Sequence, residues 1–244
     1  MVWHLPPQWP AIASRTHFCS GCCFSSSVLI FSVAISRWRS ASMMILSRLS
    51  SQLGLTGASR FEAHHADPGP SLSTLGLLRY PKHDKSAADA TAAPRNVGHN
   101  KHTDVGSLTF LLAAQWGLQY LSLTTKRWEF IEPPAGHAVI NVGDSLRFLS
   151  GGKLASVVHR VVPLRRQTQD EDRYSIAYFL RMNDGGVFHD TTGKAWTAND
   201  WHDFKFGVFK NPSALDAKGR FLTGMMMEES DKLEGGEVQI AVTA

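Results

Sequence analysis

Cysteine is scarce in this sequence, and all of it lies near the amino end. The three cysteines among 244 residues are Cys19, Cys22 and Cys23. No second pair of cysteines or histidines follows Cys19-x-x-Cys22 at zinc-finger spacing, and three adjacent thiols cannot build a disulfide framework. The sequence therefore argues against disulfide-stabilised and zinc-finger folds.

Acidic residues are absent from residues 1–61, which carry five arginines. The rest of the chain holds 20 basic and 21 acidic residues and is close to neutral. Without a basic stripe we expect no nucleic-acid partner. The apolar run over 28–35 is far shorter than the ~20 residues of a membrane span, so we expect no membrane partner either.

The first forty residues are rich in serine and arginine, which is typical of a targeting segment. No clean amphipathic period or cleavage site accompanies this composition. We therefore favour a segment that forms no part of the core, in a protein that stays in the cytoplasm.

From Ser42 onward the sequence indicates a single domain made mainly of strands. Met43, Leu46, Leu49 and Leu53 follow helical spacing and predict a helix over 42–53. A second helix is expected after Thr197, which is followed by an acidic residue three positions later. Short apolar segments separated by Gly and Pro turns predict strands at 73–81, 106–113, 117–123, 128–132, 137–143, 155–162 and 173–181. Many short strands without helices between them favour an antiparallel sandwich or jelly roll.

Two polar stretches interrupt this pattern. Residues 82–101 are small and polar and predict a flexible insertion of the kind that often covers a site. Residues 64–71, HHADPGPS, consist largely of turn formers and predict a loop.

A His-x-Asp triplet, His102-Thr103-Asp104, opens one predicted strand. Alternate residues of a strand share a face, so the imidazole and the carboxylate can point to one place. Composition alone predicts about one such triplet by chance, and His65-Ala66-Asp67 is a second one in the predicted loop. The triplet needs a third ligand from elsewhere before it indicates a metal site.

The best third ligand is His159, which interrupts a run of β-branched residues. Two histidines and one carboxylate on one side of a metal suit Fe(II) oxygen chemistry, because three adjacent positions stay open. Fourteen residues later, Arg173 offers a planar fork for a carboxylate, and Ser175 faces the same way. We expect the remaining histidines to be surface or loop residues: His64, His65, His83, His99, His137, His189 and His202.

These segments, in this order, resemble the iron(II)- and 2-oxoglutarate-dependent dioxygenases of the isopenicillin N synthase-like group. The matching stretches are LLRYP, HTDVGSLTFLL, GLQYL, WEFIEPP, HAVINVGDSLRFLSGGKLASVVHRV and RYSIAYFLR, within residues 42–210. The resemblance implies that His102, Asp104 and His159 bind iron. It also implies that Arg173 and Ser175 bind the 5-carboxylate of 2-oxoglutarate, with Tyr80 near it. Leu78 stands where the family usually has asparagine.

The resemblance implies a mainly β fold, a double-stranded β-helix (jelly roll, cupin-like) with flanking α-helices. We expect an unmatched segment at 1–40, a dioxygenase domain at 41–215 and a C-terminal tail at 216–244. Residues 1–40 do not match the family's sizeable N-terminal region, so we expect a chain without that region.

The expected cofactor is Fe(2+), with 2-oxoglutarate and O2 as co-substrates and a small-molecule metabolite as the substrate of a monomer. Hydroxylation, desaturation and ring closure all remain open. Two alternatives also remain: an iron oxidase that uses no 2-oxoglutarate, as in isopenicillin N synthase, and a non-catalytic remnant.

Overall fold

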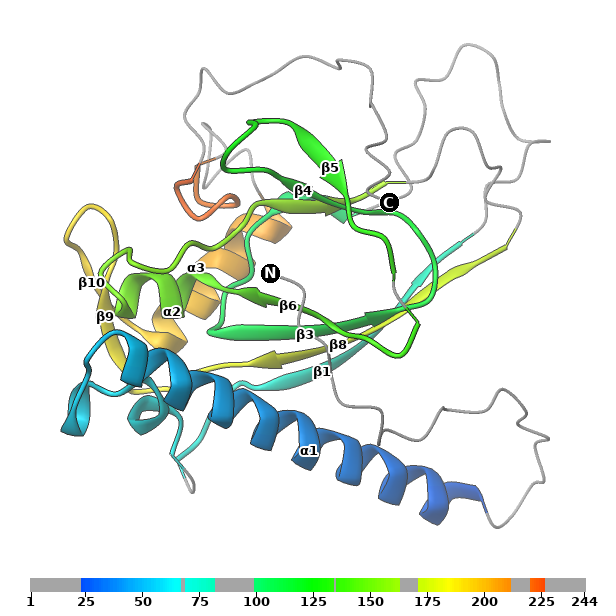
Figure 1. Ribbon diagram of the computed structural model, residues 1–244, viewed down its shortest axis with the longest axis horizontal. Helices are drawn as coiled ribbons and strands as arrows, with labels where there is room; N and C mark the ends of the chain where they lie inside the picture. Colours follow the sequence, from blue (N-terminus) through cyan, green and yellow to red (C-terminus); the bar gives the residue numbers. More distant parts are fainter. Residues whose placement is uncertain are drawn as a thin grey trace.

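Two four-stranded antiparallel sheets face each other in the computed structural model, which describes residues 23–66, 69–81, 99–133, 135–162, 171–211 and 220–226 (Figure 1). The first sheet has the order β1 (Thr74–Tyr80), β8 (Arg173–Leu180), β3 (Leu108–Ala113), β6 (Val139–Val142). The second has the order β2 (His99–His102), β7 (His159–Val161), β4 (Leu118–Leu121), β5 (Trp128–Phe130). This arrangement confirms the predicted jelly roll and all seven predicted strands, with β2 as an addition at the end of the expected insertion.

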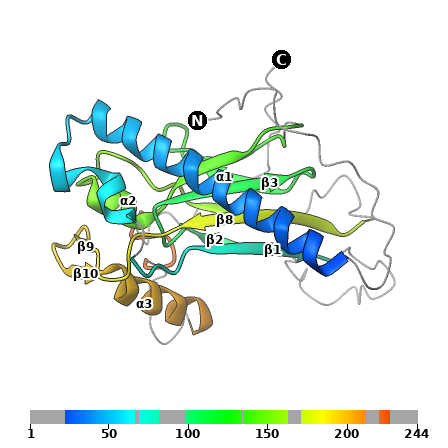
Figure 2. The same cartoon turned by 90° about the horizontal axis from the view of Figure 1, so that it is seen from below.

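The two faces of the first sheet have different partners. Because side chains alternate along a strand, Phe110, Tyr178 and Leu180 point outward and are buried against helix α1 (Cys23–Gln52). Leu46 of α1 is fully buried in this cluster, and the rings of Trp38 and Tyr178 lie 6.2 Å apart. Figure 2 shows α1 running across the sheet. The helix therefore covers an apolar face that water would otherwise contact.

Helix α1 corrects the expectation for the amino end. The predicted helix at 42–53 is only the last part of α1, which begins at Cys23. Ile35 and Trp38 pack against the core, so the prediction that residues 1–40 stay outside it is wrong for these two. The periodicity before Ser42 is weak, and tertiary contact with the sheet stabilises this part of the helix. No helix in the described residues is long and apolar enough to cross a membrane.

A second apolar cluster closes one end of the barrel. It joins helix α2 (Asp144–Leu149), helix α3 (Ala198–Lys210) and the hairpin of β9 (Val187–His189) with β10 (Ala195–Thr197). Helix α3 begins where predicted, since the Thr197 hydroxyl accepts a hydrogen bond from the amide of Asp200 at 3.1 Å. Helix α2 was not expected; its six residues are too few to show a period.

Three short segments complete the described fold. The 3₁₀ helices η1 (Gly57–Ser59) and η2 (Phe61–His65) lie between α1 and β1. Residues 220–226 pack against the second cluster through Phe221 and Met225. Residues 220–226, within the expected tail at 216–244, thus contact the core; this turn segment has no helix or strand period to detect.

The contact between α1 and the sheet generates a prediction about stability. Trp38→Ala should lower the free energy of unfolding by roughly 2 kcal/mol, about half the cost for a fully buried aromatic, because Trp38 is half-buried. Met44→Ala is the control in the same helix, since Met44 is 67% exposed. Urea unfolding measures both. Equal, small losses would show that α1 does not support the sheet.

Candidate metal centre

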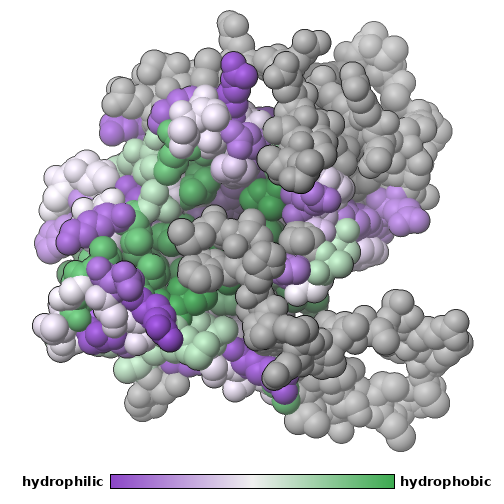
Figure 3. All heavy atoms as spheres, in the orientation of Figure 1, coloured by the Kyte–Doolittle hydropathy of each residue, from purple (hydrophilic) through white to green (hydrophobic). Residues whose placement is uncertain are grey.

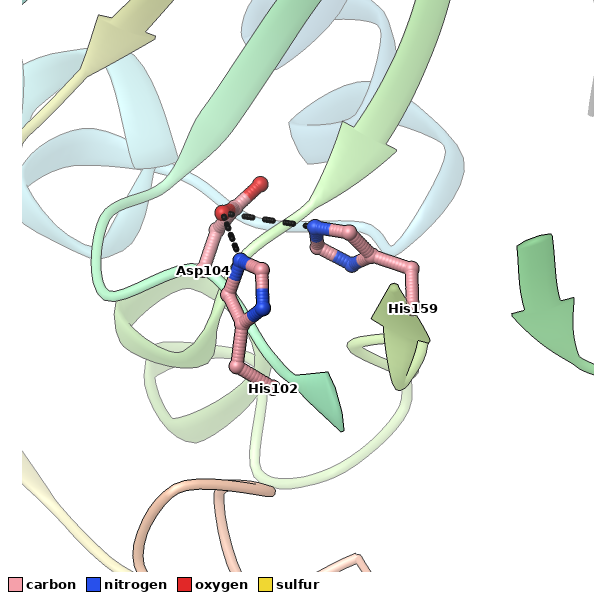
Figure 4. Close-up of side chains that lie close together, drawn as sticks. All are labelled: His102, Asp104 and His159. Atoms are coloured by element: carbon pink, nitrogen blue, oxygen red, sulfur yellow. Dashed lines mark ion pairs between the residues drawn. The ribbon is translucent and has the colours of Figure 1, made fainter. Parts of the chain in front are cut away.

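Three side chains from different segments meet inside the barrel. His102 ends β2, Asp104 follows it in the connection to β3, and His159 begins β7 (Figure 4). The Oδ1 atom of Asp104 lies 3.8 Å from His102 Nε2 and 3.7 Å from His159 Nε2. All three potential ligand atoms fall within 4.8 Å of one another. Two imidazoles and one carboxylate on one side can hold a divalent metal and leave its other side open.

Both imidazoles are oriented by backbone carbonyls. His102 Nδ1 lies 2.7 Å from the carbonyl of Asn100, and His159 Nδ1 lies 3.0 Å from the carbonyl of Val157. A carbonyl only accepts, so Nδ1 donates in each ring and Nε2 of the neutral imidazole keeps its lone pair. The two Nε2 atoms therefore face the shared point in the form that binds metal.

The carboxylate of Asp104 is buried and ionised. Its Oδ2 accepts a hydrogen bond of 2.7 Å from the side-chain amide of Asn141 in β6, which leaves Oδ1 for the histidines. Burial raises its pKa, but His159, His102 and the hydrogen bonds from Asn141 and Thr109 together lower the pKa to about 2. Burial also holds the pKa of His102 well below its usual value. A charged carboxylate beside the neutral imidazole of His102 is the protonation state that a metal-ligand set requires.

The structure brings the predicted triad together for a different reason than the one the sequence suggested. His102 and Asp104 do not share a strand, because β2 ends at His102 and β3 begins only at Leu108. Instead, the pairing of β2 with β7 places His102 directly opposite His159. Asp104 reaches them because the chain turns away from the ladder at Thr103.

The predicted carboxylate-binding residues lie on the inner face of the other sheet. Arg173 and Ser175 are buried, while Tyr174 between them is 56% exposed. Tyr80 pairs directly with Arg173 across β1 and β8, and the guanidinium carbon lies 5.0 Å from the centre of its ring. Burial raises the pKa of the Tyr80 phenol. The alternation expected from sequence is thus confirmed on β8.

The Arg173 guanidinium lines a pocket with two terminal nitrogens unpaired. Its Nε donates to the carbonyl of Trp116 at 2.9 Å, whereas Nη1 and Nη2 are buried and make no hydrogen bond within the described part of the chain. Such donors are costly to bury without an acceptor, and a ligand carboxylate would supply one. The other residues that line this pocket are Leu111, Ala113, Gln115, Leu118, Ile131, Pro133, His137 and Val139. In the space-filling view, apolar residues gather toward the middle of this side of the molecule (Figure 3).

One histidine differs from the expectation of a surface or loop position. His65 is 1% exposed, donates from Nδ1 to the carbonyl of Phe61 at 2.7 Å and accepts at Nε2 from Ser107 Oγ at 2.8 Å. Both ring nitrogens are used, so His65 itself offers no metal ligand; Asp67, the other candidate of that triplet, lies outside the described residues. His137 lines the Arg173 pocket, although nothing in its sequence position links it to the site.

Two other residues near the metal centre were not predicted from the sequence. Asn141 fixes the ligand carboxylate, and the ring of His99 lies 4.5 Å from that of His102. Strand alternation could have suggested Asn141, because residues 139 and 141 share one face of a predicted strand and Asn141 is a polar side chain there. His99 lay in the predicted flexible insertion, where no pattern singled it out.

Comparison with known proteins gives a consistent family. Residues 72–182 match the 2OG-Fe(II) oxygenase superfamily. Over 184 residues the chain is 50% identical to the 2-oxoglutarate-dependent dioxygenase iboH of Amanita muscaria, covering 75% of this chain and 85% of that protein. It is 49% identical over 192 residues to the oxidoreductase vrtI of Penicillium aethiopicum, covering 78% of this chain and 44% of vrtI.

A solved structure has the same fold. A full-length protein of Neurospora crassa, in complex with alpha-KG and thymine, superposes with a TM-score of 0.62 at 22% identity, covering 77% of this chain and 57% of that protein. The chain also spans only about half the length of several curated relatives, namely 44% of vrtI, 57% of frbH and 56% of gloE.

The burial of His65 generates a prediction about pH. Burial lowers the pKa of His65 to about 4, with His64 and Arg39 lowering it further and the Phe61 carbonyl and Glu62 opposing. Between pH 6.5 and 4 the unfolded chain therefore takes up a proton that the folded chain refuses. The free energy of unfolding should fall across this window by about 3 kcal/mol as pH decreases.

The control variant is His65→Gln, whose side chain keeps polar atoms but does not titrate between pH 4 and 6.5. Urea unfolding of both proteins with a chelator present, at several pH values, gives the difference between the two slopes. Parallel stability curves for the two proteins would contradict this assignment.

Proposed function

Because the chain belongs to the 2OG-Fe(II) oxygenase superfamily, we propose that it is a non-haem iron(II)- and 2-oxoglutarate-dependent dioxygenase that oxidises a small-molecule metabolite. The observation that carries this proposal is the meeting, inside one barrel, of three ligand side chains and of an arginine, Arg173, whose Nη1 and Nη2 have no hydrogen-bond partner among the described residues. The set matches both needs of such an enzyme: a metal face with open positions and a cation for a carboxylate.

In this proposal each inner wall has its own role. His102, Asp104 and His159 hold iron(II), with Asn141 keeping the carboxylate in place. Arg173, Ser175 and Tyr80 bind the distal carboxylate of 2-oxoglutarate from the other sheet. Bound iron supplies the redox chemistry by which 2-oxoglutarate and O2 are consumed while a second substrate is oxidised.

The use of 2-oxoglutarate is favoured over an oxidase that does without it. Three relatives that are 47–50% identical to this chain, iboH, frbH and gloE, are named as 2-oxoglutarate-dependent dioxygenases. The Nη atoms of Arg173, which have no hydrogen-bond partner in the part of the chain that the structure describes, argue against a remnant, since buried unpaired donors only destabilise a protein that binds nothing. We further propose a monomer whose catalytic unit, expected at 41–215, also includes α1 and residues 220–226.

The ligand set generates the first prediction for this function. Asp104→Ala and His159→Ala should each abolish tight Fe(II) binding, because two ligands on one face hold the ion far less well than three. His189→Ala is the control, since His189 lies in β9, exposed and away from the centre. Anaerobic titration with Fe(II) measures all three variants. Undiminished binding by Asp104→Ala would exclude this site.

The guanidinium of Arg173 generates the second prediction for this function. Arg173→Lys keeps the charge but removes the planar fork, so affinity for 2-oxoglutarate should fall by tens of fold while Fe(II) binding in its absence is unchanged. Ser175→Ala should act in the same direction but more weakly. The measurement is an anaerobic 2-oxoglutarate titration that follows the metal-to-ligand absorption band with iron present.

Arg79→Lys serves as the matched control, because Arg79 precedes Tyr80 on β1, with its side chain 63% exposed and paired with Asp172. If wild type binds iron but gives no such band at millimolar 2-oxoglutarate, the oxidase or the remnant becomes the better interpretation. If Arg173→Lys binds 2-oxoglutarate as tightly as wild type, the arginine has a structural role only.

A further inference from the structure

A fully buried lysine lies directly behind the turn that carries two of the proposed ligands. Lys205 of α3 is 0% exposed, and its ammonium donates to the Thr103 carbonyl and to Thr103 Oγ1, both at 2.7 Å. It also forms an ion pair with Asp144, the first residue of α2, which is equally buried. Lys205 is neither a proposed iron ligand nor one of the residues proposed to bind 2-oxoglutarate, so its buried position needs another explanation.

Thr103 sits between His102 and Asp104, and every polar group it has is engaged. Its amide donates to the carbonyl of Leu222 at 3.0 Å, and its hydroxyl donates to Asp144 Oδ2 at 3.1 Å. Its carbonyl accepts from Lys205, as the hydroxyl also does. Four contacts therefore fix a residue that lies outside any strand ladder.

Asp144 continues the same network to the next residue. Its amide donates to the carbonyl of Asp104 at 2.8 Å, and its side chain accepts from Ser156 Oγ at 3.0 Å. Gly224 closes the cluster from the other side: its φ is +57°, and a Cβ there would collide with Asp144 Oδ1 and Thr103 Oγ1. The backbone of both Thr103 and Asp104 is thus held from α2, α3 and residues 220–226.

This network does more than an ordinary stabilising ion pair requires. Burying two charges costs desolvation that the pair itself often fails to recover, so stability is a weak reason for a lysine here. A metal site, by contrast, needs its ligands held within about 0.5 Å of the right geometry by the residues around them. In the turn at Thr103, where the ladder is absent, these contacts hold the backbone that carries the ligands, while Asn100 and Asn141 orient the ligand side chains themselves.

We propose that Lys205 is a positioning residue for the iron site: through Thr103 it fixes the directions in which His102 and Asp104 project. The inference rests on the proposed function, because it concerns the same iron ligands. It assigns the lysine no contact with iron or with substrate.

The test replaces the ammonium with an apolar group of similar length. Lys205→Met should weaken Fe(II) binding by about tenfold or more, the range seen when outer partners of metal ligands are removed. The absorption band of the iron–2-oxoglutarate complex should shift or broaden as well. Leu46→Ala is the control, since Leu46 is fully buried in the other cluster and its loss should destabilise the fold without changing Fe(II) affinity.

A double variant separates positioning from charge neutralisation. Lys205→Met alone leaves Arg147, at 3.8 Å, as the remaining cation paired with the buried Asp144, so the variant can fail to fold. Lys205→Met with Asp144→Asn removes both charges of the Lys205–Asp144 pair. The double variant should fold more stably than Lys205→Met while Fe(II) affinity stays low, because the Thr103 carbonyl still lacks the lysine. Affinity is measured anaerobically by competition with a coloured chelator, at a temperature where each variant is folded by circular dichroism.

Four outcomes overturn the inference. Wild-type Fe(II) affinity in Lys205→Met, or its recovery in the double variant, shows that the lysine only neutralises Asp144, and the proposed function survives. An equal loss of affinity in Leu46→Ala shows that any destabilisation weakens the site. If the wild-type chain itself binds no Fe(II), both the positioning role and the proposed function fail.

Discussion

The pairing of β2 with β7 is the constraint around which the rest of the site is arranged. Neighbouring strands place directly opposed side chains about 5 Å apart, close enough for two imidazoles to share one ion. The third ligand, Asp104, cannot come from the same ladder position as His102 and His159. The chain therefore leaves the ladder at Thr103, which is itself buried. Buried backbone groups need partners. Helices α2 and α3 and residues 220–226 supply them, and this explains why three separate segments converge behind one turn.

Strand β8 gives the opposite wall its two functions. Its inward residues include Arg173 and Ser175, and its outward residues include Tyr178 and Leu180, which lie under α1. A register shift by a single residue would exchange the faces, burying the guanidinium against the helix and turning the apolar side chains inward. The apolar contact with α1 therefore also fixes the side of the sheet on which the arginine lies, so a helix that never approaches the site still contributes to its geometry.

The sequence predicted which side chains come together better than the reasons for their positions. His102, Asp104 and His159 do meet, but through strand pairing and a turn, which depend on contacts between distant segments that no local pattern contains. Arg173 and Ser175 were placed correctly because strand alternation is a local property. The burial of Lys205 could not be predicted from the sequence, since a lysine in an amphipathic helix is usually exposed and only the tertiary fold buries this one. The contact of Ile35 and Trp38 with the sheet likewise depends on the tertiary fold, so no local pattern predicted it.

The charges that line the site favour joint binding of a divalent cation and a dicarboxylate in the proposed complex. Asp104 is ionised beside the neutral imidazole of His102, and Arg173 is a cation whose outer nitrogens have no hydrogen-bond partner in the described residues. Arg173 therefore does not neutralise Asp104. In the proposed complex a divalent iron and a dicarboxylate enter between them, and the formal charges of ion, co-substrate, Asp104 and Arg173 then cancel. Each component thereby favours binding of the other, because either alone leaves a net charge in a poorly solvated interior.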